Sequence, residues 1–571
     1  MKKMFGAAVG VFVAAAVCMM GTMSVWADAE TTAAGETAAG ETQAPVIQVE
    51  GQITGTWLTS DKQNIQIQGN STGDTTGTDG NIYLFELQPY ETGIGDRRDY
   101  IQQAAVGQSF DFQVPAGLGS SPNRVYNSYM PAVYDGSKYV EVGPRHYVTN
   151  PEVAAPNQKA YPTSVTKKGL RIQIDMLDDA MDLGVKHAGT DILFQQILGS
   201  GIDYVYDGKT YHFSSAVMAE YDKTISALYG KGINVTAVIL NGWSDAAPEL
   251  HYPGTKKNAQ ANHYMFNVVT KQGYEETRAI AAFLAERYDG SNPNYGKISN
   301  WVIGNEVNNQ LNWNYMGPMD LTNYVREYLK VFRVFYTAIK TTSANDRVFL
   351  SLDFNWNHDS DGQLKYGGKE IVDSFNSIAN VEGQFDWGLA YHPYPYPMVE
   401  PEFWDDDANL VRNDFNSPII NFKNLSTLTD YFAQGALLAP SGHVRHIILT
   451  EQGFTAKSHT RGDIPYNQAA AFAYSYYLVD SNPYIDAYLL SRQVDAPGEV
   501  TQGTAFGLWE CDMSQPNRIV ATKRRKIWEV FKNIDKKSST LESTEFAKSI
   551  IGINNWSDVI PNFKWRSLEN K

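Results

Sequence analysis

The chain has 571 residues, 43% hydrophobic and 19% charged, so it is long enough for roughly two to four domains with large buried cores, and its composition excludes general disorder. The formal net charge is −16, from 47 basic and 63 acidic residues, which argues against nucleic acid or an anionic membrane surface as a partner.

The N-terminus has the pattern of an export signal. Lys2 and Lys3 precede an apolar run, and small residues stand three and one positions before a cleavage point after Ala27. The run is short and rich in alanine and glycine, unlike a membrane span. We therefore predict a signal peptide over residues 1–27 and a secreted protein with no integral membrane segment.

The chain contains two cysteines. Cys18 lies in the apolar run, where Val17 occupies a position that a lipoprotein signal reserves for a small residue. Removal of the signal would leave Cys511 as the single thiol, so we expect neither an intramolecular disulfide nor a cysteine metal site.

Residues 46–160 are typical of a β-rich domain. The preceding residues 28–45 contain the pentad AAGET twice and indicate a flexible linker. Apolar and polar residues then alternate with the period of two that marks half-buried strands. The clearest runs are 64–68, 81–87, 109–114 and a hairpin at 131–142 that turns at Asp135-Gly136. We predict a small β-sandwich-like domain that either braces its neighbour or binds sugar.

From residue 161 to about 535 predicted strands alternate with predicted helices. The strands are 169–175, 185–194, 233–240, 298–306, 347–353, 385–394, 445–454 and 484–492. The helices are 176–184, 215–230, 274–288, 321–339, 368–380, 424–438, 467–479 and 518–533. Near-continuous apolar strands indicate a parallel sheet buried on both faces. Eight units favour a closed (β/α)8 TIM barrel over the alternative, an open doubly wound sheet.

The sequence also bears on cofactors and on the segment that follows the barrel. No glycine-rich phosphate fingerprint opens any of the eight units, so we expect no nucleotide or redox cofactor. Residues 536–571 contain enough apolar side chains to predict a C-terminal tail that docks on the barrel.

In such a barrel the active site lies at the carboxyl ends of the strands, so the residues directly after each apolar run are the candidates. The fourth strand ends in Asn305-Glu306, and the seventh delivers Glu451 in the same way. Glycoside hydrolysis needs such a pair of carboxylates, in unequal environments that keep one protonated and the other ionised. Other strand ends supply candidate substrate-binding residues, namely Asn241, Trp243, Asp353, Asn355, His392, Tyr394 and Arg492.

The stretch IGNE, which ends at Glu306, and the stretch LTEQGF around Glu451 resemble motifs of the clan A glycoside hydrolases, over residues 165–535. The resemblance implies a retaining (β/α)8 enzyme in which Glu306 is the acid/base, Asn305 contacts the 2-hydroxyl of the scissile sugar and Glu451 is the nucleophile. His392 matches a looser tendency of the clan to place polar aromatic residues after strand six, as does Tyr394. The chain also resembles an uncharacterised bacterial family with a β-rich domain before such a barrel.

Two features depart from the clan A pattern. Many members end strand eight in a tryptophan that forms a floor for the scissile sugar, whereas this strand ends in Arg492 and Gln493. Trp509, in the following loop, is the candidate to replace it. Many members also carry an arginine near strand two, where this chain has Lys186 and His187.

We therefore predict a secreted retaining β-glycosidase that acts on poly- or oligosaccharides. No metal is expected, because the acidic loops at Asp359, Asp361 and 405–409 do not complete a calcium-binding spacing. The rival is an extracellular carbohydrate-binding or adhesion protein on the same scaffold. A metal-dependent hydrolase is disfavoured because no His/Asp cluster recurs at ligand spacing, and a serine hydrolase because no GxSxG motif occurs. The sugar, the linkage and the oligomeric state stay open.

Overall fold

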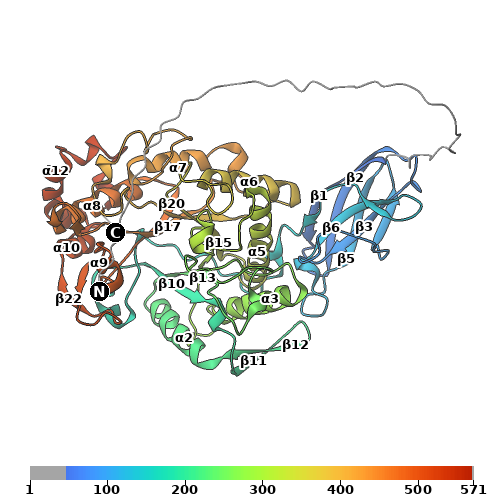
Figure 1. Ribbon diagram of the computed structural model, residues 1–571, viewed down its shortest axis with the longest axis horizontal. Helices are drawn as coiled ribbons and strands as arrows, with labels where there is room; N and C mark the ends of the chain where they lie inside the picture. The colour runs from blue at the N-terminus through green and yellow to red at the C-terminus, as the bar shows by residue number, and fades with distance from the viewer. Residues whose placement is uncertain (1–46, 569–571) are drawn as a thin grey trace, which may run out of the picture. The chain divides into compact units, whose positions relative to one another are not determined.

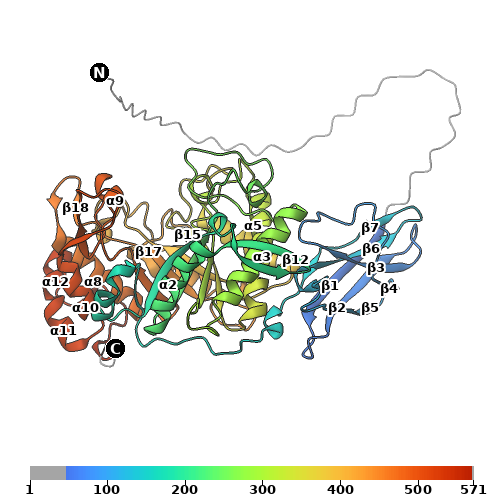
Figure 2. The same ribbon diagram turned by 90° about the horizontal axis from the view of Figure 1, so that it is seen from below.

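The computed structural model describes residues 47–568. The predicted signal peptide (1–27) and linker (28–45) lie outside the described residues. The described chain passes from antiparallel sheets into a barrel surrounded by helices (Figures 1 and 2). Within this part of the chain, no helix combines the length and the apolar character that crossing a membrane requires.

Two antiparallel sheets form the N-terminal part. One contains β1 (Gln48–Leu58), β2 (Asn64–Asp74) and β5 (Ser109–Pro115). The other contains β3 (Asn81–Leu87), β4 (Gln102–Ala105), β6 (Ser128–Tyr134), β7 (Tyr139–Glu141) and β8 (His146–Tyr147). Ile65 and Phe110 of the first sheet share a core with Ile82 of the second, so the predicted sandwich is confirmed. The predicted hairpin is β6–β7, which turns at Asp135-Gly136 with Gly136 at φ 93°.

Eight parallel strands close into a barrel. In chain order they are β9 (Lys168–Leu170), β10 (His187–Leu193), β13 (Asn234–Leu240), β14 (Asn300–Ile303), β15 (Arg347–Asp353), β16 (Gly388–His392), β17 (Ile447–Gln452) and β20 (Ile485–Leu490). Each strand pairs with the next, and β20 returns to β9 with Tyr488 opposite Lys168. The closed ring confirms the predicted TIM barrel and excludes an open sheet, which would leave two unpaired edges. Apolar side chains fill the interior, among them Val302, Phe349, Ile448 and Leu489.

Helices surround this ring. They are the short α1 (Leu177–Asp182) and the longer α2 (Ser215–Gly230), α3 (Lys271–Arg287), α5 (Leu321–Thr342), α6 (Gly368–Glu382), α7 (Leu425–Phe432), α8 (Pro465–Ser481) and α10 (Lys526–Asn533). The side chains of Ser214, Thr270 and Asp320 each accept a backbone N–H at the start of α2, α3 and α5, which explains where these helices begin. Short helices α4 (Gln310–Trp313) and α9 (Pro497–Thr501) lie in the loops.

The structure corrects the prediction in the segment 518–533. Its first part is a strand, β22 (Ala521–Arg524), and the helix begins only at Lys526. The strand forms because its backbone pairs with β21 (Trp509–Cys511) instead of turning into a helix. The loops also carry hairpins that the sequence pattern did not predict, β11 (Gly201–Tyr206) with β12 (Lys209–Ser214), and β18 (Lys457–Ser458) with β19 (Gly462–Asp463).

The chain after the barrel continues in two short helices, α11 (Lys537–Ser543) and α12 (Glu545–Ile551). α12 packs on α8, and the ring of Trp556 lies edge-on to Tyr477 of α8 with centroids 4.7 Å apart. At the start of this segment Asp535 accepts a hydrogen bond of 2.9 Å from the buried Lys168 of β9. This ion pair joins the first barrel strand to the chain after the last barrel helix.

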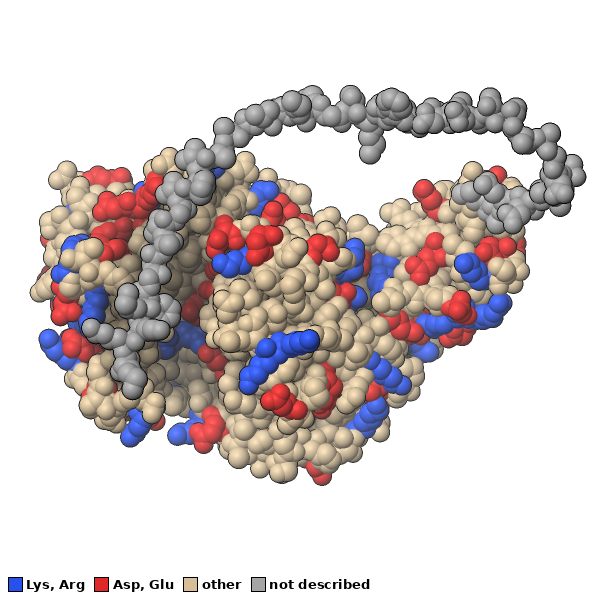
Figure 3. All heavy atoms as spheres, viewed as in Figure 1, with Lys and Arg blue, Asp and Glu red and all other residues tan. Residues whose placement is uncertain are grey.

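Charged side chains are mixed over the surface. On the face in Figure 3, basic side chains are scattered among acidic ones. Several are held in ion pairs, such as Arg461 with Glu400 and Glu402. A surface of this kind does not present a continuous positive field to a polyanion on that face.

Candidate active site

The turn after β14 determines where Glu306 points. Gly304 has φ 79°, and its N–H donates to the carbonyl of Ile239 at 3.0 Å, which keeps the turn against β13. Glu306 itself has φ 40°, a left-handed conformation that costs a non-glycine residue about 1–2 kcal/mol. Its N–H donates to Ser351 Oγ of β15 at 3.0 Å. The strained turn therefore holds the carboxyl group of Glu306 over the mouth of the barrel.

His392, the last residue of β16, links the strands that carry the two acids. Its Nδ1 lies 2.8 Å from Glu306 Oε1, and its Nε2 lies 2.9 Å from Thr450 Oγ1. Thr450 directly precedes Glu451 on β17. The imidazole is buried, so its two contacts are largely shielded from water and connect the turn after β14 to β17.

The Glu306–His392 pair shares a proton near neutral pH. Burial raises the pKa of the Glu306 carboxyl to about 7, the hydrogen bond from His392 opposes this rise, and Asp353 and Glu451 add to it. Burial works against the charged imidazole of His392, but the bond to Glu306 and the nearby carboxylates leave its pKa raised. One proton is therefore retained between the two side chains at a pH where an exposed carboxyl group has lost it.

Glu451 lies in a different environment. The hydroxyl of Tyr394 donates to Glu451 Oε1 at 3.1 Å. Arg171 stands nearby: its burial disfavours the charged guanidinium, but Asp191 and Glu451 together raise the pKa of that group. Arg171 Nη2 pairs with Asp191 Oδ2 at 2.5 Å. A hydroxyl donor and a guanidinium thus surround Glu451, whereas the hydrogen-bond partner of Glu306 is an imidazole.

Arg171 is a site residue that the sequence reasoning missed. The predicted first strand covered 169–175, which placed this arginine in mid-strand. The strand β9 ends at Leu170, so Arg171 is the first residue beyond a barrel strand, where functional side chains are expected. The rule that functional residues follow strand ends would have selected Arg171 if the first strand had been predicted to end at Leu170.

Asp353 and Asn355 form a buried network beneath Glu306. Asp353 accepts hydrogen bonds from Asn308 Nδ2 at 2.5 Å and from Asn355 Nδ2 at 2.9 Å. The side-chain Oδ1 of Asn308 in turn accepts the backbone N–H of Asp353 at 3.0 Å. Because Asn308 belongs to the loop that carries Glu306, Asp353 braces that loop while Asn355 holds the Asp353 carboxyl group. Asp353 also raises the pKa of Glu306.

Arg492 comes after β20 and pairs with Glu499 of α9. Burial raises the pKa of Glu499, Arg492 opposes the rise and Glu451 contributes to it, which places this pair on the Glu451 side of the barrel mouth. Asn305 is 7% exposed, and within the described part of the chain its side-chain amide forms no hydrogen bond, so the amide is available to a ligand.

Three other predicted residues are engaged in holding loops. Asn241 is 1% exposed, and its side-chain amide donates to the carbonyl of Leu250 at 2.9 Å, which braces the loop after β13. Trp243 is half-buried and stacks on His251 with ring centroids 4.6 Å apart. Trp509 donates its indole N–H to Asp179 Oδ2 at 3.0 Å, and this contact, not one with a carboxylate of the pair, accounts for its orientation.

The acidic loops organise their own backbone. Asp361 Oδ1 accepts the N–H groups of Gln363, Leu364 and Lys365 at 2.7–2.9 Å. Among the described residues, no group of three or more His, Cys, Asp or Glu side chains is arranged to hold a metal ion.

Several known proteins are similar to this chain. A family 39 glycoside hydrolase from the gut symbiont Bacteroides cellulosilyticus WH2 is similar over 83% of this chain and 80% of its own, with 14% identity and a TM-score of 0.44. A family 1 β-glucosidase from Thermotoga maritima is similar over 65% of this chain and 86% of its own, with 13% identity and a TM-score of 0.37. No curated protein matches the sequence. The model of a family of unknown function, DUF5722, matches residues 160–559, which is more than half of the chain, and the chain therefore belongs to that family.

Proposed function

We propose that the protein is a glycoside hydrolase that cleaves β-glycosidic bonds in poly- or oligosaccharides by a retaining double displacement. The observation that carries the proposal is the inequality of two carboxyl groups at the mouth of one barrel. Glu306 is largely enclosed, with 13% of its side chain exposed, and shares a proton with His392, whereas Glu451 accepts a hydrogen bond from Tyr394 and lies near Arg171. Unequal environments of this kind assign one carboxyl the role of acid and the other that of anion.

In the first step the Glu451 carboxylate attacks the anomeric carbon of the bound sugar. The bond from that carbon to the glycosidic oxygen breaks, and the Glu306 carboxyl gives its proton to the departing oxygen. The products of this step are a glycosyl ester on Glu451 and a free leaving group. Arg171 and Tyr394 stabilise the attacking carboxylate before the bond forms.

In the second step Glu306 acts as a base. It takes a proton from a water molecule, and the oxygen of that water attacks the anomeric carbon and displaces Glu451. His392 is in contact with Glu306 throughout, so it can stabilise the carboxylate that the first step creates. Two displacements at one carbon leave the sugar with its original β configuration.

Features around the two acids support a saccharide as the substrate. Asn305 has a free amide beside Glu306, which suits a hydrogen bond to a sugar hydroxyl. Trp313 is half-buried and stacks on His263, with ring centroids 5.7 Å apart. Asp191, the partner of Arg171, opposes the lowering of the His263 pKa by burial, so this aromatic pair lies close to the Glu451 side. Aromatic faces of this kind stack on sugar rings. The predicted signal peptide supports action outside the cell.

A mechanism-based label tests the proposal. Incubation with 2,4-dinitrophenyl 2-deoxy-2-fluoro-β-glycosides of glucose, xylose, mannose and galactose should release one equivalent of dinitrophenol and add one sugar to the peptide that contains Glu451. The matched control Glu529→Gln, at an exposed position of α10, should label like the wild type. Hydrolysis with inversion, or a label on another residue, would contradict the retaining assignment.

The second candidate function is a carbohydrate-binding or adhesion protein without turnover. A free amide and an aromatic pair beside the carboxylates would serve binding equally well. Measurable binding of an oligosaccharide without any product after prolonged incubation would favour this candidate over the enzyme.

A further inference from the structure

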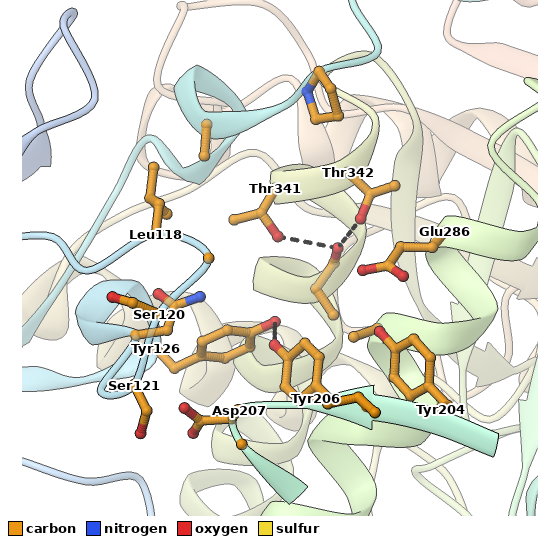
Figure 4. Close-up of a pocket in the computed structure, with 18 of the residues that line it drawn as sticks. Leu118, Ser120, Ser121, Tyr126, Tyr204, Tyr206, Asp207, Glu286, Thr341 and Thr342 are labelled. Carbon is orange, nitrogen blue, oxygen red and sulfur yellow. Dashed lines mark hydrogen bonds between the residues drawn. The ribbon is translucent and has the colours of Figure 1, made fainter. Parts of the chain in front are cut away.

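A second cavity lies between the β-rich part and the barrel helices, and none of the catalytic residues named above lines it. Its volume is about 590 Å³, within the usual range for small-molecule sites. Figure 4 shows Ser120 and Tyr126 of the β-rich part on one side, and Tyr204 and Glu286 on the other. The hairpin β11–β12, α3 and α5 complete the walls, so three separate stretches of the barrel region and two of the β-rich part (118–126 and 154–156) meet around the space.

The walls of this cavity are held in place by contacts of their own. The hydroxyl of Tyr206 donates to that of Tyr126 at 3.1 Å, which ties the hairpin to the β-rich part. The guanidinium of Arg278 lies 5.4 Å from the ring centroid of Tyr126 and 5.2 Å from that of Tyr206. Arg278 also pairs with Asp207 at the tip of the hairpin. The cavity is therefore formed before any ligand arrives.

The lining combines aromatic rings with oxygen atoms. Hydroxyl, amide and carboxyl groups on the walls belong to Ser120, Ser121, Asn123, Asp289, Thr341 and Thr342. The hydroxyl of Tyr204 and the Oδ1 atom of Asp207 are buried and form no well-aligned hydrogen bond among the described residues, although Glu286 lies close to Tyr204 and Ser121 lies close to Asp207. Buried polar atoms normally have partners, so these two are sites where a ligand can contribute hydrogen bonds.

The charged side chains around the cavity disfavour an anionic ligand. Burial raises the pKa of Glu286, the nearby Tyr204 hydroxyl opposes this rise, and Asp289 adds to it. Arg278 is already paired with Asp207, so a phosphate or a carboxylate would meet acidic groups and no unpaired arginine among these lining contacts. A purely apolar ligand would leave the hydroxyls and carboxyls unsatisfied. A neutral polyhydroxylated molecule suits both the polar groups and the aromatic rings of the lining. Its hydroxyls donate to the carboxyl oxygens, and its C–H faces cover the tyrosine rings.

We propose that this cavity binds a neutral saccharide unit, as a carbohydrate site separate from the two carboxylates at the barrel mouth. Tyr204 provides a ring and a hydroxyl, Glu286 accepts sugar hydroxyls, and Asp207 completes the polar wall. The site would hold one part of a glycan chain while another part extends beyond the cavity. It needs no turnover, so it goes beyond the proposed function and stands or fails independently of it.

Hydrogen exchange on the full chain tests the site. The variant Glu451→Gln is used as background so that an oligosaccharide is not consumed, and cellohexaose, xylohexaose and mannohexaose are the probes. At least one of them should slow exchange in residues 118–126 and 201–208. Adding Tyr204→Ala or Glu286→Ala should remove this protection and weaken binding at the cavity about tenfold or more, because each change removes a contact to the sugar. Protection around residues 305–306 should be unchanged.

Controls separate loss of the site from loss of the fold. Tyr484→Ala, an exposed tyrosine outside the cavity, should bind like the background. Tyr204→Phe retains the ring but loses the hydroxyl, so its affinity for the oligosaccharide should lie between that of the background and that of the alanine variant. The saccharide site would be overturned if all three probes leave 118–126 and 201–208 unprotected, if they protect the barrel mouth alone, or if the cavity variants bind like the background. Protection by tetramethylammonium but by none of the sugars would overturn it in favour of a cation site.

Discussion

His392 at the end of β16 and Glu306 in the turn after β14 form a partly buried hydrogen-bonded pair, with 2.8 Å between Nδ1 and Oε1. The other ring nitrogen of His392 contacts Thr450 at 2.9 Å, next to Glu451 in the chain. One side chain therefore connects the predicted acid to the strand of the predicted nucleophile. This arrangement makes the ionisation of Glu306 depend on His392, and it leads to the first prediction.

Replacement of His392 by leucine should shift the alkaline limb of the pH–rate profile to higher pH by about one unit. The hydrogen bond from His392 opposes the rise of the Glu306 pKa, so its removal raises that pKa and keeps the proton on Glu306 to higher pH. The measurement is kcat/KM against pH. His392→Gln retains a donor and should restore most of the wild-type limb; an unchanged or lowered limb in the leucine variant would contradict the assignment.

The two carboxyl variants should differ in their response to the leaving group. Glu451→Gln should abolish turnover of all substrates, because no other group can form the glycosyl ester. Glu306→Gln should lower kcat/KM by about 10²–10⁴ for a sugar leaving group, and far less for dinitrophenolate, which departs without a proton. Kinetics with both substrate types check this. Equal losses on the two substrates would show that Glu306 is not the acid, and Glu529→Gln is the matched control.

Arg171→Met should reduce kcat by roughly 10²-fold, because it removes a positive charge that faces Glu451 and leaves Asp191 without its partner. The effect should lie mainly in the first chemical step, so the burst of aglycone release slows in stopped-flow measurements. Arg171→Lys retains the positive charge, so its kcat should fall less than that of Arg171→Met. The exposed Arg412→Met serves as the control, since this arginine lies in a surface loop with Asp414. A burst rate equal to that of the wild type in Arg171→Met would show that Arg171 does not act on Glu451.

The free energy of unfolding should depend strongly on the buried pair Lys168–Asp535, both of whose side chains are less than 5% exposed. Lys168→Met should lower it by about 3–5 kcal/mol, because Asp535 is then buried without a counter-charge. Denaturant titration measures the change. The double variant Lys168→Met/Asp535→Leu should recover most of the loss, whereas Lys231→Met, at an exposed position, should stay within about 0.5 kcal/mol of the wild type.

His187 should make the protein sensitive to acid. Burial lowers the pKa of its imidazole to about 4, below the ordinary value of 6.5. Between these two values the unfolded chain binds a proton that the folded chain does not, so stability is lost as the pH falls from about 6.5 to 4, by up to roughly 3 kcal/mol. The free energy of unfolding of His187→Gln should therefore change less than that of the wild type between pH 7 and 5. His212→Gln, at an exposed site, should behave like the wild type, and parallel curves for all three would refute the prediction.

Much of the barrel can be read from local patterns in the sequence. Each strand appears as an apolar run and each helix as an apolar stripe, and both depend on residues that are close in the chain. Parallel strands place their carboxyl ends on one face of the barrel, so the positions of Glu306 and Glu451 at the same mouth followed from strand order alone.

Contacts between distant segments were decided by the tertiary structure. The first strand pairs over three residues only, and no local signal marks its end at Leu170, so Arg171 was missed. The segment 521–524 is a strand because β21 lies beside it. Asn241 directly follows a barrel strand as predicted, but its side chain donates to the carbonyl of Leu250. Trp509, predicted in the loop after strand eight, begins β21 and donates to Asp179.

The sequence by itself determined the period of each element, the strand order and the chemical type of each strand end. These properties depend on neighbouring residues. Which polar group meets which partner, as in the pairing of His392 with Glu306, depends on side chains 86 positions apart in the chain. That pairing, and with it the proton shared near neutral pH, exists only once the barrel has closed and water has been excluded from its mouth.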